Sequence, residues 1–282
     1  MLSEKKIFPV CLLAVFIAAA CNNNTSTGST TPASDSVAKQ PQWKEENITY
    51  NGDNSTLDGY VVYDESTDKK RPAVLVVPEW WGLTEYPKSR ARDLAKLGYV
   101  AFAVDIYGNG KTADNPDSAT KYSTEFYKDP QKAKRRIDAA IAKIKTYSQV
   151  DTSNIAAVGY CFGGGLLLNT VRLGDELKGV VSFHGGLIGT PANKDLLRSK
   201  ILVCHGGADP LVPQKDVDQF KKQMDSIGAN YQIKVYEGAK HAFTNPDATR
   251  LGEKFKMPIA YNAPADTASW NDMKTFFGTL FQ

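Results

Sequence analysis

Histidine and cysteine are scarce in this sequence, and runs of a single charge are missing. The 282 residues include three histidines and four cysteines, and 34 Lys and Arg face 31 Asp and Glu. The mixed run KDPQKAKRR, residues 128–136, is typical of a solvated helix face, so nucleic acid is not an expected partner. With 42% hydrophobic residues and no internal repeat, the chain is expected to form one globular domain.

Long hydrophobic runs are also missing. The apolar stretch IFPVCLLAVFIAAA, residues 7–20, is too short to span a membrane comfortably, and with Lys5 and Lys6 before it the stretch is typical of a signal-peptide core. The small residues before Cys21 resemble the lipobox of bacterial lipoproteins, although Ala18 stands where leucine is more usual. We therefore predict a lipoprotein-type signal peptide over residues 1–20, with cleavage before Cys21 and acylation of its thiol. The alternative is an ordinary signal cleavage site that happens to precede this cysteine.

A polar segment follows the predicted lipidation site. Residues 22–42, NNNTSTGSTTPASDSVAKQPQ, are rich in Ser, Thr, Asn and Pro and have little to bury. Residues 21–42 are therefore predicted to be a flexible tether, and residues 43–282 the folded domain. A lipid on Cys21 would hold that domain to a membrane of the bacterial cell envelope, on the periplasmic or outer-membrane side.

From residue 43 onward, strand-like runs alternate with helical segments. The first two runs, at 46–50 and 57–63, flank the turn signal NGDN and predict a hairpin. Further strands are predicted at 72–77, 99–105, 154–160, 179–183, 200–205 and 231–236. Helices are predicted at 88–98, 130–147, 213–227 and 264–281. This alternation predicts an α/β fold with a mostly parallel central sheet, helices on both faces and a single domain.

The segment GYCFG, residues 159–163, lies between a predicted buried strand and a Leu-rich helical segment. G-x-C-x-G is the nucleophile-elbow pattern with cysteine in the place of serine. The tight turn requires glycine at positions 159 and 163 and lifts the side chain of Cys161 clear of the sheet. A helix N-terminus also favours the thiolate. The alternative is a glycine-rich turn that holds a small buried cysteine.

A thiol nucleophile needs a base, and the candidates are His184, His205 and His241. In the chain order nucleophile, acid, histidine, Asp209 follows a predicted strand in CHGGADPLVP, and only His241 lies downstream of it. We predict Cys161 as the nucleophile, His241 as its base and later acid, and Asp209 as the carboxylate that orients the imidazole. By itself His241 is as well explained as a surface histidine. His205 is interpreted as a packing or hydrogen-bonding residue, and His184 as a structural residue or, alternatively, a substrate contact.

The loop VPEWWGL, residues 77–83, follows the strand predicted at 72–77. An oxyanion hole is expected from the backbone N–H of Phe162 and a second N–H in this loop. Glu79, Trp80 and Trp81 are expected at the same rim as the nucleophile, and the two indoles are equally well explained by packing.

Five stretches, in order, resemble the dienelactone hydrolase family of the α/β-hydrolase fold, whose members are carboxymethylenebutenolidase-like. They are PEWWGL, ARDLAKLGYVAFAVDIYG, GYCFGGG, HGGADPLVP and YEGAKHAF, and the resemblance runs from about Leu57 to Phe281. It implies an α/β-hydrolase that cleaves a small ester or lactone without a metal or organic cofactor. It also implies the triad named above, Glu79 as an acid that touches the resting thiol and helps to activate it, and the N–H of Trp80 as the second oxyanion donor.

The sequence departs from the family at the substrate clamp. Dienelactone-cleaving members hold the substrate carboxylate with two arginines, whereas DIYGNGK and HAFTNP place Asn109 and Asn245 near those positions. Lys111 supplies only a flexible ammonium, so an anionic lactone is a poor expected substrate. Activation of the thiol then needs another route, or the protein is a weaker and broader hydrolase. The substrate-binding candidates are Trp81, Tyr107, Asn109, His184 and Asn245.

The two remaining cysteines, Cys161 and Cys204, are expected to stay free. One strand is expected between them, which separates them by roughly 9 to 10 Å, and a disulfide needs Cα atoms closer than about 7 Å. The sequence thus predicts a cysteine hydrolase. The alternatives are a non-catalytic envelope protein that binds a ligand and a thiol acyltransferase on the same fold. The ordered triad favours an enzyme, and no residue separates hydrolase from transferase.

Overall fold

The computed structural model describes residues 40–282. The predicted signal peptide, Cys21 and most of the predicted tether lie outside the described residues. Residues Lys39–Gln282 form one compact unit. Between residues 40 and 282, no helix combines the length and the apolar character that crossing a membrane requires.

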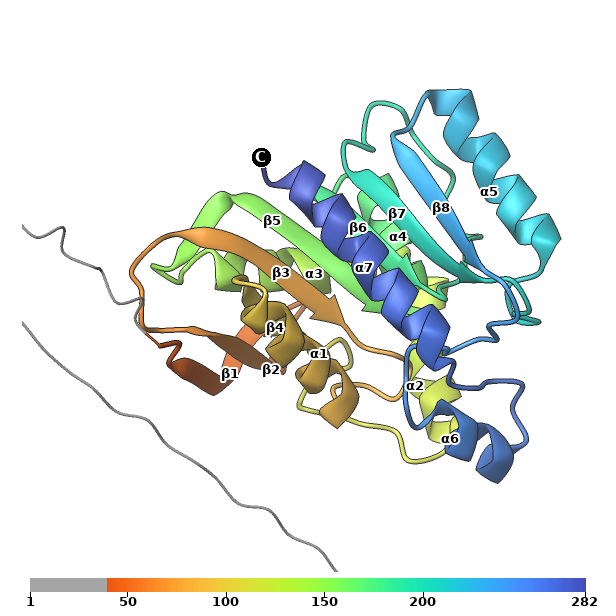
Figure 1. The fold of residues 1–282 in the computed structure, drawn as a ribbon, viewed down its shortest axis with the longest axis horizontal. Coiled ribbons are helices and arrows are strands. Elements are labelled where there is room, and N and C mark those ends of the chain that lie inside the picture. The colour runs from red at the N-terminus through yellow and green to blue at the C-terminus, as the bar shows by residue number, and fades with distance from the viewer. Residues whose placement is uncertain (1–39) are drawn as a thin grey trace, which may run out of the picture. The chain divides into compact units, whose positions relative to one another are not determined.

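The described residues build an eight-stranded sheet with the order β1-β2-β4-β3-β5-β6-β7-β8 (Figure 1). Strands β1 and β2 form the predicted hairpin, and β2 pairs antiparallel with β4, whereas all later pairings are parallel. The strands are β1 (Trp43–Gly52), β2 (Ser55–Asp64), β3 (Arg71–Val77), β4 (Val100–Ala103), β5 (Val150–Tyr160), β6 (Gly179–Phe183), β7 (Lys200–Gly206) and β8 (Tyr231–Tyr236).

Helices cover both faces of this sheet. They are α1 (Glu85–Lys96), α2 (Pro116–Lys128), α3 (Pro130–Ile144), α4 (Phe162–Arg172), α5 (Gln214–Ile227), α6 (Ala248–Phe255) and α7 (Ala263–Leu280). Figure 1 shows α1 and α7 in front of the sheet, and their apolar side chains join one core cluster, while α3, α4 and α5 build the other. Successive residues of β3 enter opposite clusters, Leu75 one and Val76 the other, which explains its unbroken apolar run. The predicted α/β-hydrolase fold is confirmed.

Candidate active site

Strand β5 and helix α4 meet in a sharp turn at Cys161. The backbone of this residue has φ 52° and ψ −114°, a strained conformation for a residue with a side chain. A Cβ on Gly163 would lie 2.4 Å from the carbonyl oxygen of Val77 and 2.6 Å from that of Pro78, and a Cβ on Gly159 would lie 2.4 Å from the carbonyl oxygen of Gly163. Both glycines of the G-x-C-x-G pattern are therefore required by close backbone approach.

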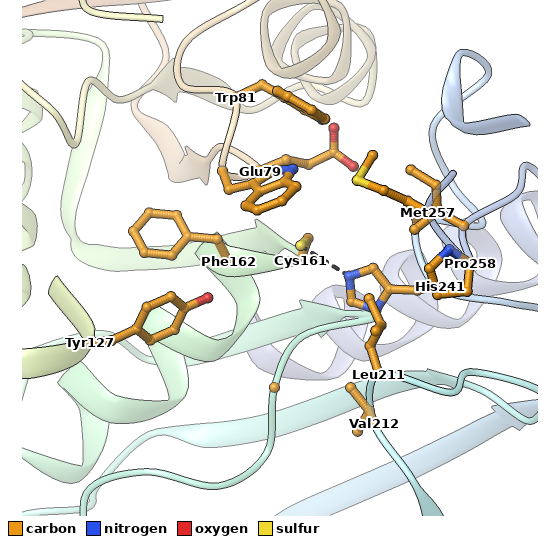
Figure 2. Close-up of a pocket in the computed structure, with 14 residues that line it drawn as sticks. Glu79, Trp81, Tyr127, Cys161, Phe162, Leu211, Val212, His241, Met257 and Pro258 are labelled. Atoms are coloured by element: carbon orange, nitrogen blue, oxygen red, sulfur yellow. Dashed lines mark hydrogen bonds between the residues drawn. The ribbon is translucent and has the colours of Figure 1, made fainter. Parts of the chain in front are cut away.

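The loops that follow β7 and β8 bring Asp209 and His241 to this turn. His241 Nε2 lies 3.0 Å from Cys161 Sγ, and His241 Nδ1 lies 2.8 Å from Asp209 Oδ2 (Figure 2). The other oxygen of Asp209 accepts hydrogen bonds from the backbone N–H groups of Leu211 and Val212, at 2.8 and 3.3 Å. The carboxylate is thus held in place by its own loop, and it fixes the orientation of the imidazole.

The charge state of His241 follows from these contacts. Burial disfavours the imidazolium, but the facing Cys161 and the hydrogen bond to Asp209 outweigh it and raise the pKa of His241 to about 10. At neutral pH the imidazole therefore keeps its proton next to the sulfur. A protonated imidazole beside a cysteine is what a thiolate–imidazolium pair requires.

His184 lies behind Cys161 and does not line the cavity. The N–H of Cys161 is shared between the carbonyl oxygen of Phe183, at 2.9 Å, and Nδ1 of His184, at 3.1 Å. Because Nδ1 accepts, Nε2 carries the proton and donates to Thr244 Oγ1, at 2.7 Å. Burial, followed by the charge of His241, holds the pKa of His184 well below its usual range, so the ring stays neutral. Of the two interpretations of His184, the structure favours the structural one.

Thr244 connects His184 to two helices through further polar contacts. The sequence analysis does not predict these contacts. Its hydroxyl lies 2.7 Å from that of Tyr86 on α1, and its carbonyl oxygen accepts a hydrogen bond from Arg90. Arg90 also forms an ion pair of 2.6 Å with Asp266 on α7. The elbow is thus tied to both helices that cover one face of the sheet.

Glu79 follows β3, is buried and lines the same cavity as Cys161. Its Oε2 accepts a hydrogen bond of 2.6 Å from Asn245 Nδ2, and within residues 40–282 no hydrogen bond joins it to Cys161. The sulfur is hydrogen-bonded to His241 instead, so no hydrogen bond supports the implied contact between Glu79 and the resting thiol. Burial raises the pKa of Glu79 to about 7, and the hydrogen bond from Asn245 opposes this rise. Asn245, expected at the substrate, binds the carboxylate.

A cavity of about 370 Å³ opens over the sulfur (Figure 2). The part of the chain from residue 40 onward contains no group of three or more His, Cys, Asp or Glu side chains that could hold a metal ion. The cavity is lined by Glu79, Trp80, Trp81, Tyr127, Cys161, Phe162, Gly186, Leu211, Val212, His241, Ala242, Met257, Pro258 and Ile259.

Of the predicted substrate contacts, only Trp81 lines this cavity. Tyr107 is buried, and its hydroxyl donates a hydrogen bond of 2.7 Å to the carbonyl oxygen of Trp80. Asn109 lies exposed in a turn with φ 56°, where its N–H bonds the carbonyl oxygen of Thr56. Tyr107 thus supports the loop that carries Trp80, and Asn109 takes no part in the site. Sequence reasoning missed Tyr127 and the segment 257–259, which lie outside the five stretches that resemble the family, and it assigned no role to Leu211 within HGGADPLVP.

The two expected oxyanion donors have free N–H groups. Within the described chain, the backbone N–H groups of Trp80 and Phe162 donate no hydrogen bond, and both residues line the cavity. Phe162 is the first residue of α4, where N–H groups lack an intrahelical acceptor. Both groups are therefore available to a developing negative charge near the sulfur.

Cys204 lies on β7, and β6 separates this strand from β5. Cys161 and Cys204 are both free thiols, as predicted. Burial raises the pKa of the Cys204 thiol to about 12, so it is an inert residue of the core. His205, the next residue along β7, is also buried and absent from the cavity wall.

The chain matches the model of the dienelactone hydrolase family over residues 57–281. A protein of Aquifex aeolicus (strain VF5) named "Putative carboxymethylenebutenolidase" is 33% identical over 217 residues, which is 75% of this chain and 89% of that protein. The solved dienelactone hydrolase-like promiscuous phosphotriesterase P91 from metagenomic libraries is 33% identical with a TM-score of 0.79, and the match covers 84% of this chain and 98% of that one. A solved protein titled m3DLH is 32% identical with a TM-score of 0.80, over 85% and 99% of the two chains. Since the family match spans nearly all of the described chain, including the elbow and both loops that meet it, the protein belongs to the dienelactone hydrolase family and is a carboxylic ester hydrolase.

Proposed function

We propose that the protein hydrolyses a small ester or lactone through a cysteinyl acyl-enzyme. The observation that carries this proposal is the 3.0 Å contact between Cys161 Sγ and His241 Nε2, with Asp209 on the far side of the imidazole. A protonated imidazole beside a sulfur matches an activated cysteine nucleophile.

In the first half of the reaction, the thiolate of Cys161 attacks the ester carbonyl and a C–S bond forms. The carbonyl oxygen takes up the negative charge, and the N–H groups of Trp80 and Phe162 stabilise it. The C–O bond to the alcohol then breaks, and His241 donates its proton to the leaving oxygen. Asp209 stabilises the imidazolium throughout.

In the second half, water replaces the alcohol. His241 removes a proton from the water, whose oxygen attacks the thioester carbon. The C–S bond breaks and the acid is released. The proton taken from the water stays on His241 and the negative charge returns to Cys161 Sγ, so the starting state of the enzyme is restored. With an acceptor other than water, the same steps describe an acyltransferase.

The proposal is tested with p-nitrophenyl acetate, by burst and steady-state release of p-nitrophenol. Cys161→Ala is expected to lose at least about 1,000-fold in steady-state rate. The matched control is Cys204→Ala, which removes the other thiol of the folded domain and should keep the activity. A burst without turnover in the wild type would point to an acyltransferase. No reaction in the wild type or in Cys161→Ala would favour a ligand-binding protein.

We also propose that the protein works in the bacterial cell envelope with a lipid on Cys21. The support is the basic pair at residues 5 and 6, the apolar run and the small residues that precede this cysteine. Cell fractionation tests it: Cys21→Ser should move the protein out of the membrane fraction. Cys11→Ser, inside the predicted signal peptide, is the control that should leave it there.

A further inference from the structure

The wall of the active-site cavity is apolar on several sides. The indoles of Trp80 and Trp81 lie 5.1 Å apart, and Trp81 lies 5.9 Å from Phe255 of α6. Figure 2 shows Leu211 and Val212 below His241 in that view, and Met257 also lines the cavity. Indole, thioether and aliphatic side chains of this kind stabilise an uncharged hydrocarbon chain by burying it.

Within the described residues, no lysine or arginine lines the cavity. The cationic group nearest to the nucleophile is the imidazolium of His241, and both of its nitrogens are engaged, Nδ1 with Asp209 and Nε2 with Cys161. A substrate carboxylate would therefore find no free cation. A charged group that leaves water without a partner binds at a large cost.

Glu79 adds a second obstacle to an anion. Its carboxyl group lies in the cavity wall, and the amide of Asn245 binds one of its oxygens. An anionic substrate would bring a second carboxylate next to this one, and like charges in a site of low polarity disfavour each other.

We propose that the cavity selects uncharged esters with an apolar acyl chain and rejects esters whose acyl chain carries a carboxylate. This inference rests on the proposed function and names its substrate class. Neutral substrates need no clamp, because the hydrocarbon is held by the apolar wall and the ester carbonyl by the two free N–H groups.

The test compares two esters with the full-length protein: p-nitrophenyl hexanoate and the mono-p-nitrophenyl ester of adipic acid. They have the same acyl length, and a carboxylate replaces the terminal methyl in the second. After subtraction of spontaneous hydrolysis, kcat/KM for the hexanoate is expected to exceed that for the adipate by at least about tenfold. It should also exceed kcat/KM for p-nitrophenyl acetate. Equal or faster cleavage of the adipate overturns the inference while the proposed hydrolysis stands. If neither ester is turned over, the proposed function fails.

A variant with a new charge tests the electrostatic cause directly. Leu211 lines the cavity and is 52% exposed, so Leu211→Arg adds a cation at its mouth with little disturbance of the core. This variant is expected to raise the adipate-to-hexanoate ratio of kcat/KM about fivefold. Val235→Arg is the matched control: Val235 is 48% exposed on β8, outside the cavity wall, and its replacement adds the same charge. An equal rise in both variants, or a rise in neither, would refute the role assigned to the cavity wall.

Discussion

The buried carboxyl group of Glu79 destabilises the folded protein, and one substitution should remove this destabilisation. Its carboxyl group is buried, and burial raises its pKa from 4.5 to about 7. In the folded protein the charged carboxylate is therefore disfavoured by about 3 kcal/mol relative to the unfolded chain. Glu79→Gln keeps the size of the side chain and leaves an amide oxygen that can accept the hydrogen bond from Asn245. It removes the charge.

The sign of the pH dependence follows from the raised pKa. Below pH 4.5, Glu79 is protonated in both the folded and the unfolded chain, so the wild type and Glu79→Gln differ by an amount that does not depend on pH. Between pH 4.5 and about 7, the folded protein retains a proton that the unfolded chain has lost, and the wild type becomes progressively less stable. Above about pH 7 the full cost is present. The free energy of unfolding of Glu79→Gln, relative to that of the wild type, should therefore be higher at pH 8.5 than at pH 4.5 by about 3 kcal/mol.

Urea unfolding at pH 4.5 and pH 8.5 measures this gain. The comparison uses the difference between the two proteins at each pH, because other titrating groups contribute about equally to both. Glu253→Gln, at an exposed carboxyl on α6, is the matched control and should change stability by less than about 0.5 kcal/mol at either pH. If the difference between Glu79→Gln and the wild type is the same at both pH values, the argument that burial penalises this carboxylate is refuted.

Substitutions at three positions and one pH dependence test other parts of the site. Cys161→Ala removes the largest contribution that raises the pKa of His241, so NMR titration of this ring should show a pKa well below the value of about 10; an unchanged titration would argue against the thiolate–imidazolium pair. Because His241 must donate a proton to the leaving oxygen and loses that proton above about pH 10, the rate of hydrolysis by the wild type, measured as a function of pH, should decline above this value. Gly163→Ala places a Cβ 2.4 Å from a carbonyl oxygen of β3 and should cost about 1 to 3 kcal/mol in urea unfolding. Gly278→Ala in α7, whose added Cβ meets no heavy atom within 4 Å, should instead stabilise by up to about 1 kcal/mol, and equal effects would mean that the elbow is not tight. His184→Asn keeps an acceptor near the N–H of Cys161 and should retain most of kcat, whereas His184→Leu should lower kcat about tenfold; equal kcat in both would assign the ring to packing alone.

Helices α2 and α6 are not predicted by the sequence pattern. Helix α2, PDSATKYSTEFYK, buries only Ala119, Ser123 and Phe126, so its apolar stripe is thin. Helix α6 has eight residues and buries Ala248 and Gly252. Helix α2 contains no Leu, Ile, Val or Met, and α6 contains a single Leu, so little aliphatic periodicity marks either helix in the sequence.

The sequence alone determined the order of the strands along the chain, the turn at Cys161 and the positions of Asp209 and His241. Apolar runs mark strands buried on both faces, two glycines mark a turn without room for side chains, and the carboxyl ends of parallel strands lie on one edge of the sheet. These features depend on neighbours in the chain or on the topology that follows from them. The site could therefore be predicted from the sequence, and in the structure His241 contacts both Cys161 and Asp209.

Only the tertiary structure decided which partners the remaining polar groups have. Glu79 and Asn245 are 166 residues apart, and no spacing rule pairs them. His184 approaches the N–H of Cys161 only because β5 and β6 lie side by side with Tyr160 opposite Phe183. A buried donor or acceptor bonds to whatever partner the packed chain brings within about 3 Å. The same packing decided which side chains form the cavity wall, because it brings together the loops that follow β3, β7 and β8, the elbow, Tyr127 of α2 and the segment 257–259.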